Sequence, residues 1–279
     1  MYTFSAPAKL NLFLHVIGRR QDGYHLLQTV FRLIDYCDQL SFQLRNDGIV
    51  KLHNPIAGVP EEQDLCVRAA QLLKQKMNVA QGVDIFLQKQ IPIGGGLGGG
   101  SSDAATTLLA LNRLWQINLD KEQLLELGLQ LGADVPIFIF GQNAFAEGIG
   151  EQLTALQLPP AWYLILVPNV QVSTAEIFAS KELTRNTLPI TIPPFSVWQG
   201  RNDLESVTCR AYPEIARYLE WLKRLEDTTI VSMSGSGACV FAEFQTESKA
   251  QAAFEQVPEN MKAFLAKGLD SHPLYNFRG

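Results

Sequence analysis

The sequence predicts an α+β fold in two domains, and three observations lead to that prediction. Segments with strand periodicity and segments with helical periodicity are mixed in both halves of the 279-residue chain, without the strict alternation of a doubly wound parallel sheet. Six glycines fall within residues 94–100, immediately before a segment with helical spacing. The rigid Pro159-Pro160 pair precedes a new apolar strand, so we expect domains at residues 1–158 and 159–279.

The elements of the first domain follow from the spacing of its apolar residues. Alternation with β-favouring side chains predicts strands, and apolar positions three or four residues apart predict helices. Before the glycines we expect strands at 3–17 and 39–52 in a hairpin-like start, a helix at 64–77 and a strand at 83–87. After them we expect a helix with Ala104, Leu108, Leu111 and Trp115 on one face, a helix at 121–131 that ends at Gly132, and a strand or buried turn at 137–140. Ser101 or Ser102 is the expected N-cap of the helix after the glycines, because a serine hydroxyl accepts a hydrogen bond from the first turn.

The second domain is expected to begin with a buried strand at 162–167. A proline-rich loop at 188–194, a helix at 213–225, a pair of strands around Gly235 and Gly237, a helix at 249–256 and a final strand at 263–269 complete it. We find no internal repeats and expect no long disordered tail.

Composition argues against several classes of function. The formal net charge is -5 and no dense block of lysine and arginine is present, so a nucleic-acid partner is not expected. The apolar stretch at residues 10–17 contains Asn11 and His15 and is far shorter than the roughly 20 residues of a membrane span. The four cysteines lack the short spacings of a zinc site or a redox pair, so we predict buried thiols in a reducing compartment. The expected location is the cytosol, or an organelle after processing.

The glycine-rich stretch is the most informative functional signal. Glycines let successive backbone N–H groups approach an anion without steric conflict, and the following helix adds the positive end of its dipole, so the stretch predicts a phosphate-binding loop. Residues 94–99 also satisfy the dinucleotide fingerprint G-x-G-x-x-G, but they follow about 90 residues of other structure, whereas that fingerprint belongs to a first βα turn. A P-loop requires a lysine where residues 100–102 are Gly-Ser-Ser, so a cation must come from elsewhere in the chain.

Three motifs, in this order, resemble those of the GHMP small-molecule kinases. They are Pro7-Ala8-Lys9-Leu10-Asn11-Leu12, the glycine-rich stretch from Pro92 to Ala105, and Ser234-Gly235-Ser236-Gly237-Ala238. Three further segments resemble the branch of that family that phosphorylates 4-diphosphocytidyl-2-C-methyl-D-erythritol. They are Asp22-Gly23-Tyr24-His25, Gly132-Ala133-Asp134-Val135-Pro136 and Gly148-x-Gly150-Glu151. The matching segments run from residue 7 to residue 240, and their joint occurrence in order is highly specific.

The resemblance implies a fold, a reaction and its co-substrates. The expected fold is the two-domain GHMP kinase architecture, with an N-terminal domain like domain 2 of ribosomal protein S5, a ferredoxin-like C-terminal domain, and an active site in the cleft between them. The implied reaction is the ATP-dependent phosphorylation of the 2-hydroxyl of 4-diphosphocytidyl-2-C-methyl-D-erythritol in non-mevalonate isoprenoid biosynthesis. Mg²⁺ would be held chiefly by the triphosphate, without a dedicated protein metal site. The expected partners are ATP and CDP-methylerythritol, bound by a monomer or weak homodimer in a bacterial cytoplasm or a plastid stroma.

Lys9 and Asp134 are the catalytic residues that the resemblance implies. By sequence alone, a lone strand lysine is typically a surface residue, and an aspartate between Gly132 and Pro136 typically caps a turn. In the family, this aspartate faces the substrate hydroxyl and the lysine pairs with it. A carboxylate that accepts the hydroxyl proton contributes typically about 10²–10⁴-fold, and a lysine offsets negative charge around the transferred group. Whether Asp134 acts as a base or as an orienting group stays open.

The remaining site residues form a nucleotide set and a substrate set. The resemblance implies a nucleotide set of Leu65, Pro92, Gly94, Gly95, Gly96, Leu97, Gly98, Gly99, Gly100, Ser101 and Ser102, in which the loop binds the phosphates and Leu65 borders the adenine. The implied substrate set is Asn11, Tyr24, His25, Phe178, Ser236 and Gly237. By sequence alone Tyr24 and Phe178 are more typical of core aromatics, whereas in the family the matching residues stack on either side of the cytosine. Asp64 stands where the family often has asparagine, so an adenine contact there would use carboxylate acceptors only.

Three other functions stay open at this point. A GHMP kinase for mevalonate, homoserine or a sugar would bind an acceptor without cytosine, so Tyr24, His25 and Phe178 discriminate it from the reaction above. A nucleotide-binding regulator that has lost catalysis is disfavoured by the presence of both Lys9 and Asp134. An oxidoreductase would have to bind a nicotinamide cofactor.

Overall fold

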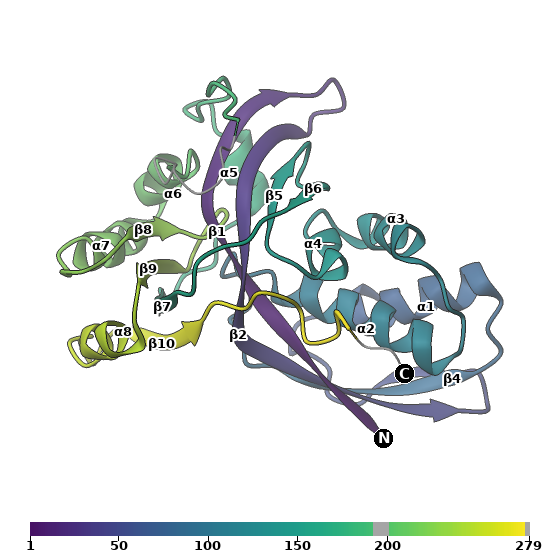
Figure 1. Ribbon diagram of the computed structural model, residues 1–279. Helices are drawn as coiled ribbons and strands as arrows, with labels where there is room; N and C mark the ends of the chain where they lie inside the picture. The colour runs from purple at the N-terminus through teal and green to yellow at the C-terminus, as the bar shows by residue number, and fades with distance from the viewer. Residues whose placement is uncertain (192–200, 277–279) are drawn as a thin grey trace.

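The structure, a computed structural model that describes residues 1–191 and 201–276, contains two β-sheets with helices packed against them (Figure 1). Within those ranges the first sheet has six strands and the second has four. The predicted α+β class is confirmed, because neither sheet has the repeated parallel βαβ units of a doubly wound fold.

A long hairpin forms the centre of the first sheet. β1 (Tyr2–Arg19) pairs antiparallel with β2 (His25–Arg45), and three register shifts interrupt the pairing. The predicted strand at 3–17 is confirmed, but the predicted strand at 39–52 is not a single element, because β2 begins well before residue 39 and ends at Arg45. Its first part was missed because Gln28 and Arg32 are polar and yet buried, which hides the alternation that a half-buried strand normally shows.

The other strands of the first sheet extend on both sides of β2. β4 (Gly82–Gln88) pairs with β2 and confirms the predicted strand at 83–87, while β3 (Val50–Leu52) joins β4 in parallel. β5 (Ala144–Glu147) and β6 (Gln152–Ala155) continue the sheet on the opposite side of β2. Neither was predicted, since each has only four residues and is too short to show a period.

The helices on the first sheet share one apolar core with it. We call the first sheet and its helices the first unit, and the second sheet and its helices the second unit. α1 (Leu65–Met77), which follows the 3₁₀ turn η1 (Glu61–Gln63), α2 (Gly99–Leu114) and α3 (Lys121–Leu131) confirm the three predicted helices. Their buried apolar residues pack in a single cluster with those of β2 and β4. This packing fixes the end of α2 that follows the glycines.

The N-cap of α2 differs from the prediction. It is Gly98, which has a left-handed conformation with φ 72° and forms no side-chain cap. Ser101 and Ser102 therefore lie inside the first turn, and the expectation that one of them caps the helix is wrong. A left-handed residue brings the chain into the helix at an angle that only glycine adopts without strain.

The predicted strand or buried turn at 137–140 is also wrong. These residues belong to a short helix, α4 (Val135–Phe140), which has Pro136 in its first turn and ends at Gly141 with φ 73°. Proline at the start and a left-handed glycine at the end are typical helix boundaries. The apolar run between them does not by itself distinguish a buried helix from a buried strand.

The second sheet has the strand order β10, β7, β9, β8. These strands are β7 (Trp162–Val167), β8 (Ile230–Met233), β9 (Val240–Phe244) and β10 (Lys262–Lys267), and they confirm the strands predicted in this half of the chain. Each strand is antiparallel to its neighbours. The predicted helices are α7 (Pro213–Leu222) and α8 (Glu247–Phe254). Two short helices, α5 (Thr174–Ala179) and α6 (Glu205–Ala211), were not predicted because six or seven residues show too little periodicity.

The predicted domain boundary at residues 158 and 159 falls between β6 and β7, and it stays a prediction. The chain after β10 returns to the first unit, where the Leu269 N–H donates to the Leu33 carbonyl (2.8 Å) and the Asn143 amide donates to the Leu269 carbonyl (2.8 Å). Residues 192–194 of the predicted proline-rich loop lie outside the described residues.

The cysteines only partly agree with the prediction of four buried thiols. Cys66 and Cys239 are buried, whereas Cys37 and Cys209 are partly exposed, and all four are free. Cys37 lies at a register shift of the hairpin, and Cys209 lies on the short α6 at the edge of an apolar cluster. Within the described ranges, no helix combines the length and the apolar character needed to cross a bilayer.

Candidate active site

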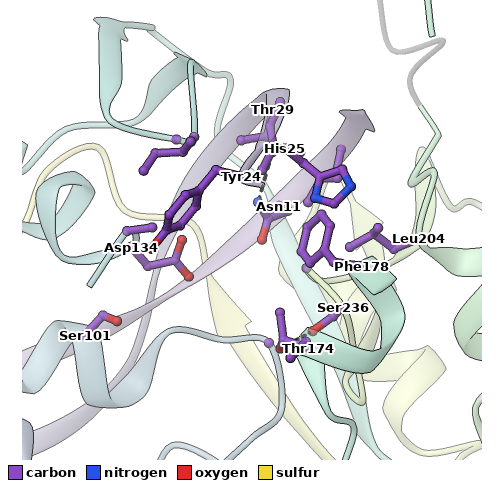
Figure 2. Close-up of a pocket in the computed structure, with 18 of the residues that line it drawn as sticks. Asn11, Tyr24, His25, Thr29, Ser101, Asp134, Thr174, Phe178, Leu204 and Ser236 are labelled. Carbon is purple, nitrogen blue, oxygen red and sulfur yellow. Dashed lines mark hydrogen bonds between the residues drawn. The ribbon is translucent and has the colours of Figure 1, made fainter. Parts of the chain in front are cut away.

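A cavity of about 690 Å³ lies where the two units meet (Figure 2). The β1–β2 hairpin, the glycine-rich loop and the residues before α4 line it from the first unit, and α5 and the loop at 234–237 line it from the second. A volume of this size is typical of small-molecule sites. The cavity is therefore the candidate active site, and the sequence segments that form it are distant from one another in the chain.

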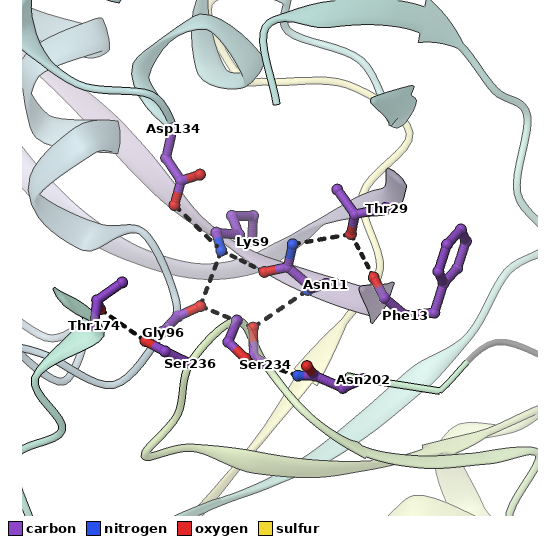
Figure 3. Close-up of polar contacts among 11 residues, drawn as sticks. Lys9, Asn11, Phe13, Thr29, Gly96, Asp134, Thr174, Asn202, Ser234 and Ser236 are labelled. Atoms are coloured by element: carbon purple, nitrogen blue, oxygen red, sulfur yellow. Dashed lines mark hydrogen bonds and ion pairs between the residues drawn. The ribbon is translucent and has the colours of Figure 1, made fainter. Parts of the chain in front are cut away.

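Lys9 and Asp134 meet in this cavity. The Lys9 Nζ lies 3.4 Å from the Asp134 Oδ2 (Figure 3), and the two side chains are 3% and 40% exposed. The Lys9 ammonium also donates to the Asn11 Oδ1 (2.5 Å) and to the Gly96 carbonyl (3.0 Å). Since an ammonium has three protons, these contacts hold the lysine in one orientation, with its charge directed at the carboxylate.

Asp134 occupies the N-cap position of α4, but it does not cap the helix. Its backbone is helical, with φ -88° and ψ -5°, and its carboxylate accepts no hydrogen bond from the first turn. The carboxylate instead lines the cavity. The turn-capping alternative considered for this aspartate is thus not what the structure has.

A buried network of polar residues contacts Lys9 through Asn11 and fixes the position of the lysine at the cavity. The Asn11 amide donates to the Thr29 Oγ1 (3.0 Å), and the Thr29 hydroxyl donates to the Phe13 carbonyl. The Asn11 N–H donates to the Ser234 Oγ (3.2 Å), and the Ser234 hydroxyl donates to the Gly96 carbonyl (2.8 Å). Figure 3 shows this chain of contacts linking both units. A fully paired network in a buried place restricts the side chains to one arrangement.

The glycine-rich loop is held through its carbonyl groups. The Gly96 carbonyl accepts from the Lys9 ammonium, and the Leu97 carbonyl accepts from the Lys9 N–H (2.9 Å). Within the part of the chain that the structure describes, the backbone N–H groups of residues 96–101 donate to no protein acceptor. Three of these groups belong to the first turn of α2, where helical N–H groups have no partner in the helix. A loop fixed by its carbonyls with its N–H groups free is suited to bind an anion.

Two glycines of the loop are required by close approach. Gly96 has φ 74°, and a Cβ there would lie 2.1 Å from the Ser234 carbonyl oxygen. Gly98 has φ 72°, and a Cβ there would lie 2.9 Å from the Phe138 ring and 3.1 Å from the Lys9 Cε. A side chain at Gly96 would displace the loop at residues 234–237, the second glycine loop, and a side chain at Gly98 would displace the Phe138 ring or Lys9.

Two aromatic side chains face the cavity from different units. Tyr24, at the turn of the hairpin, is 58% exposed, and Phe178 lies on α5. In Figure 2 they lie on opposite sides of the cavity with Asn11 between them. The His25 ring lies beside Phe178, with ring centroids 4.9 Å apart and planes tilted by 31°. Burial lowers the pKa of His25, and the positive charges of Arg185 and Arg19 lower it further, so this imidazole is neutral at pH 7.

Most of the predicted substrate set reaches the cavity. Asn11, Tyr24, His25, Phe178 and Ser236 line it, whereas Gly237 does not. A Cβ at Gly237 would lie 2.9 Å from the Met233 Sδ and 3.4 Å from Thr208, so this residue faces the core of the second unit. The structure therefore does not place Gly237 at the cavity.

The predicted nucleotide set is divided. Gly96 and Ser101 line the cavity, and the Ser102 hydroxyl is fully buried without a partner, so Ser101 is the serine that faces a ligand. Leu65 lies close to the first turn of α2, 3.4 Å from where a Cβ on Gly100 would be. The other members, which lie on or beside the same loop without lining the cavity, are Pro92, Gly94, Gly95, Leu97, Gly98, Gly99 and Gly100.

Asp64 has a structural role that the sequence reasoning missed. It is the N-cap of α1, where its Oδ1 accepts from the Cys66 N–H (2.8 Å) and the Val67 N–H (3.4 Å), and it is buried. Capping explains a carboxylate at this position without reference to a ligand. Any contact with adenine would be left to the second oxygen.

Several residues at the site were not predicted. Thr29, Thr174 and Arg19 line the cavity, and the Thr174 Oγ1 lies 2.7 Å from the Ser236 Oγ, which links α5 to the second glycine loop. Ser234 supports Asn11 and Gly96. Ser234 stands inside a motif that had been recognised, so a signal for it existed, whereas the two threonines are ordinary polar residues with no informative spacing.

The site offers few ligands for a metal ion. In residues 1–191 and 201–276, no group of three or more histidines, cysteines and carboxylates is placed to hold one. The carboxylates at the cavity are Asp22 and Asp134, and the Ser101 hydroxyl is close to the free N–H groups of the loop. Such a donor set suits a hard cation that takes most of its ligands from a bound phosphate chain.

Comparison with known proteins gives concordant similarities. The family profile for the GHMP kinases N terminal domain matches residues 64–142, and that for the GHMP kinases C terminal matches residues 197–263. A protein of Nitrosospira multiformis named 4-diphosphocytidyl-2-C-methyl-D-erythritol kinase is 67% identical over 98% of this chain and 92% of its own length. A protein of Nitrosomonas europaea with the same name is 61% identical over 99% of this chain and 100% of its own length. A crystal structure of 4-(cytidine 5'-diphospho)-2C-methyl-D-erythritol kinase superimposes with a TM-score of 0.83 at 33% identity, and it covers 96% of this chain and 99% of that one.

Proposed function

The chain belongs to the GHMP kinase family, and from this premise we propose that it transfers the γ-phosphoryl group of ATP to the 2-hydroxyl of 4-diphosphocytidyl-2-C-methyl-D-erythritol. The product would be the 2-phosphate, with ADP released, in non-mevalonate isoprenoid precursor biosynthesis. The observation that supports this acceptor is the cavity itself, because the Lys9–Asp134 pair lies in the same space as Tyr24, His25 and Phe178.

We assign the transfer step to Asp134 and Lys9. The Asp134 carboxylate lines the cavity and is not used in capping, so it is available to receive the proton of the acceptor hydroxyl. As the bond between the hydroxyl oxygen and the γ-phosphorus forms, the bond from that phosphorus to the bridging oxygen breaks and ADP departs. The Lys9 ammonium offsets negative charge on the transferred group, and its buried contacts keep it in position throughout.

The glycine-rich loop is the proposed phosphate site. Its free N–H groups at residues 96–101 and the N-terminus of α2 would bind the triphosphate. Mg²⁺, held mainly by the phosphates, would neutralise part of their charge, and Ser101 is the residue that we expect beside it. Leu65, at the start of α1, would border the adenine.

The other end of the cavity is the proposed cytidine site. Tyr24 and Phe178, which line the cavity on opposite sides, would stack on the two faces of the base, and each such contact typically contributes roughly 1–3 kcal/mol. A base held there directs the rest of the acceptor towards Asp134. A kinase for mevalonate, homoserine or a sugar has no use for this pair of aromatic residues.

A direct assay tests the proposal. The purified protein with ATP, Mg²⁺ and 4-diphosphocytidyl-2-C-methyl-D-erythritol should release ADP and form the 2-phosphate, and CMP should compete with the acceptor. Mevalonate and homoserine serve as matched controls. Phosphorylation of either of these in place of the cytidylyl compound would reject the assigned substrate while leaving the kinase family intact.

Location and assembly follow as expectations. The relatives named above are bacterial, which supports the expected bacterial cytoplasm. All the residues assigned to the transfer step come from one chain, which is compatible with the expected monomer or weak homodimer.

A further inference from the structure

Arg185 makes four hydrogen bonds next to the proposed cytidine site. Its Nη2 donates to the carbonyls of Phe178 (2.9 Å) and Ser180 (2.6 Å), and its Nη1 donates to the carbonyl of Leu183 (3.1 Å). Its Nε donates to the Nε2 of His25 (3.0 Å). One guanidinium thus joins the end of α5 to the first residue of β2, which belongs to the other unit.

The contact with His25 fixes the positions of the imidazole protons. A guanidinium can only donate, so the His25 Nε2 must be the acceptor, and the proton of the neutral ring must be on Nδ1. Within the described chain Nδ1 has no hydrogen-bond partner, and it is not among the enclosed unpartnered atoms, while the residue lines the cavity. The ring therefore presents a donor to a ligand and no acceptor.

The contacts with α5 fix the second half of the base site. The last carbonyls of a helix have no partner within it, and arginine near a helix end can satisfy them. Because Arg185 binds the carbonyl of Phe178 itself, the same side chain places the Phe178 ring and the His25 ring, whose centroids are 4.9 Å apart (Figure 2).

We propose that Arg185 is a positioning residue for base recognition. It holds His25 as the Nδ1–H tautomer, so that the cavity offers a hydrogen-bond donor to an acceptor atom of the cytosine. It also couples the position of this imidazole to that of the Phe178 ring. The proposal rests on the proposed cytidylyl substrate. It adds a determinant that does not touch the substrate and acts through two residues that do.

The effect of protonating the His25 ring on substrate binding distinguishes the proposed role of Arg185 from a merely structural one. The charged groups that act on the His25 ring are Arg185, from the segment after α5, and Arg19, from β1, and both are cations; Asp22 in the hairpin turn pairs with Arg20 (2.7 Å). A protonated imidazole carries N–H on both nitrogens, so acid restores a donor on Nδ1 even where the tautomer is no longer fixed. The diphosphate of the acceptor is esterified at both ends and does not titrate in the same range.

Nitrogen-15 NMR of the free protein tests the tautomer directly. In the wild type, His25 should show a protonated Nδ1 and an unprotonated Nε2 at about pH 7.5. Arg185→Met should abolish that preference, whereas Arg19→Gln, which removes a nearby charge without a contact to the ring, should preserve it. A wild-type ring protonated on Nε2 would overturn the proposal, even if the Arg185 variant failed to fold. Since no substrate is present, this result does not depend on the proposed function.

Binding then tests the consequence. Calorimetry with 4-diphosphocytidyl-2-C-methyl-D-erythritol and no ATP should give a wild-type Kd that is nearly constant from about pH 6 to 8. In Arg185→Met the Kd at pH 8 should rise severalfold, because only the neutral rings that carry their proton on Nδ1 can donate to the base, and the Kd should fall again as the pH falls. Arg224→Met, at an exposed position beyond α7, is the matched control and should behave as the wild type. A pH-independent loss in Arg185→Met would reject the tautomer role, whereas no binding by the wild type at any pH would reject the substrate instead.

Discussion

At the scale of single residues, the site depends on a lysine that is buried and a carboxylate that is not. Lys9 is 3% exposed and Asp134 is 40% exposed, although they form an ion pair. A buried ammonium is tolerated only when its protons are satisfied, and Asn11 and Gly96 provide two of the three acceptors. Asp134 is therefore the partner that can turn towards a substrate hydroxyl while the lysine remains fixed.

Substitution of Asp134 tests this division of roles. Asp134→Ala and the isosteric Asp134→Asn should both lower kcat by at least about 10²-fold, because neither side chain accepts the hydroxyl proton. The KM for ATP should change little, since the glycine-rich loop proposed to bind the phosphates lies on other elements. Steady-state kinetics with a thermal melt of each variant provides the measurement. Near-normal turnover of Asp134→Asn would exclude the base role and leave only orientation.

The pairing of Lys9 with Asp134 could be predicted from sequence only because whole motifs surrounded both residues. Spacing alone indicated a surface lysine for Lys9 and a turn cap for Asp134, and both of these alternatives differ from the structure. Thr29 and Arg185 could not be found, because each acquires its role from a partner on another element: Phe13 and Asn11 for the threonine, and His25 for the arginine. Such pairings depend on the register and packing of the fold, which a local pattern does not contain.

At the scale of elements, two glycine loops touch each other across the units. The Gly96 carbonyl accepts from the Ser234 hydroxyl, and the Cys239 N–H donates to the Gly95 carbonyl (3.1 Å). Gly94 and Gly96 have nearly the same left-handed backbone, with φ 71° and 74°, but their surroundings differ. A Cβ at Gly94 would meet nothing within 4 Å, whereas one at Gly96 would overlap the Ser234 backbone.

Alanine at these two glycines separates backbone strain from steric contact. Gly94→Ala should destabilise the ligand-free protein by about 1–2 kcal/mol, the cost of a left-handed alanine. Gly96→Ala should cost clearly more, because the backbone that it meets cannot move without separating the two loops. Urea unfolding of both variants measures the difference. Equal destabilisation would show that the loops do not pack as closely as described.

Element boundaries illustrate what a local pattern can and cannot give. The three long helices of the first unit were predicted because apolar residues recur over 11 to 16 residues. α4 was misassigned because six consecutive residues of mostly apolar character carry no period, and its limits are set by Pro136 and Gly141 instead. The early part of β2 was missed because it buries polar residues, two of which, Gln28 and Thr29, pair with groups that are distant in sequence.

A buried cluster joins three elements beside the glycine-rich loop. Lys89, after β4, contacts Asp38 of β2 and lies 2.7 Å from the Asp103 Oδ2 of α2. Burial raises the pKa of Asp103 to about 8, and the nearby Asp38 carboxylate raises it as well, while Lys89 opposes the shift. Two buried carboxylates that share one lysine leave one of them protonated at neutral pH.

The pH dependence of stability tests this cluster. The folded state retains the Asp103 proton up to about pH 8, whereas the unfolded chain loses it near pH 4, so this group makes folding less favourable as the pH rises between these values. Asp103→Asn has no carboxyl group to titrate. The difference between its melting temperature and that of the wild type should therefore rise by several degrees between about pH 5 and pH 8.5, because each kcal/mol of stability changes the melting temperature by roughly 2–4 °C. Thermal melts at four pH values suffice. A constant difference would show that Asp103 is ionised throughout.

At the scale of the whole molecule, the hairpin and the C-terminal segment both connect the two units. β1 runs from the first sheet to the second unit (Figure 1), where Leu14 forms a bridge with Asn202. After β10 the chain returns, and the His272 N–H donates to the carbonyl of Gly141 at the end of α4 (2.8 Å). The cavity is thus formed by units that the chain crosses more than once, which limits how far they can move apart.

We expect His272 to make the stability of this returning segment depend on pH. It is buried, its Nδ1 accepts from the Leu274 N–H (3.0 Å), and its Nε2 lies 3.5 Å from the Thr106 hydroxyl. Burial lowers the pKa of His272 to about 3, against an ordinary value of 6.5. The unfolded chain therefore binds a proton between these values that the folded protein does not bind, and stability is lost as the pH falls below about 6.5.

The variant His272→Asn isolates this effect. Its amide oxygen can still accept from the Leu274 N–H, but it cannot be protonated, so the variant should be less stable than the wild type at pH 7.5 and should lose less stability on acidification. Melting temperatures from about pH 7.5 to 4.5 should therefore converge or cross, and hydrogen exchange should show the segment after β10 opening first in the wild type. Parallel curves for the two proteins would mean that acid acts elsewhere and that the returning segment is not where the molecule begins to open.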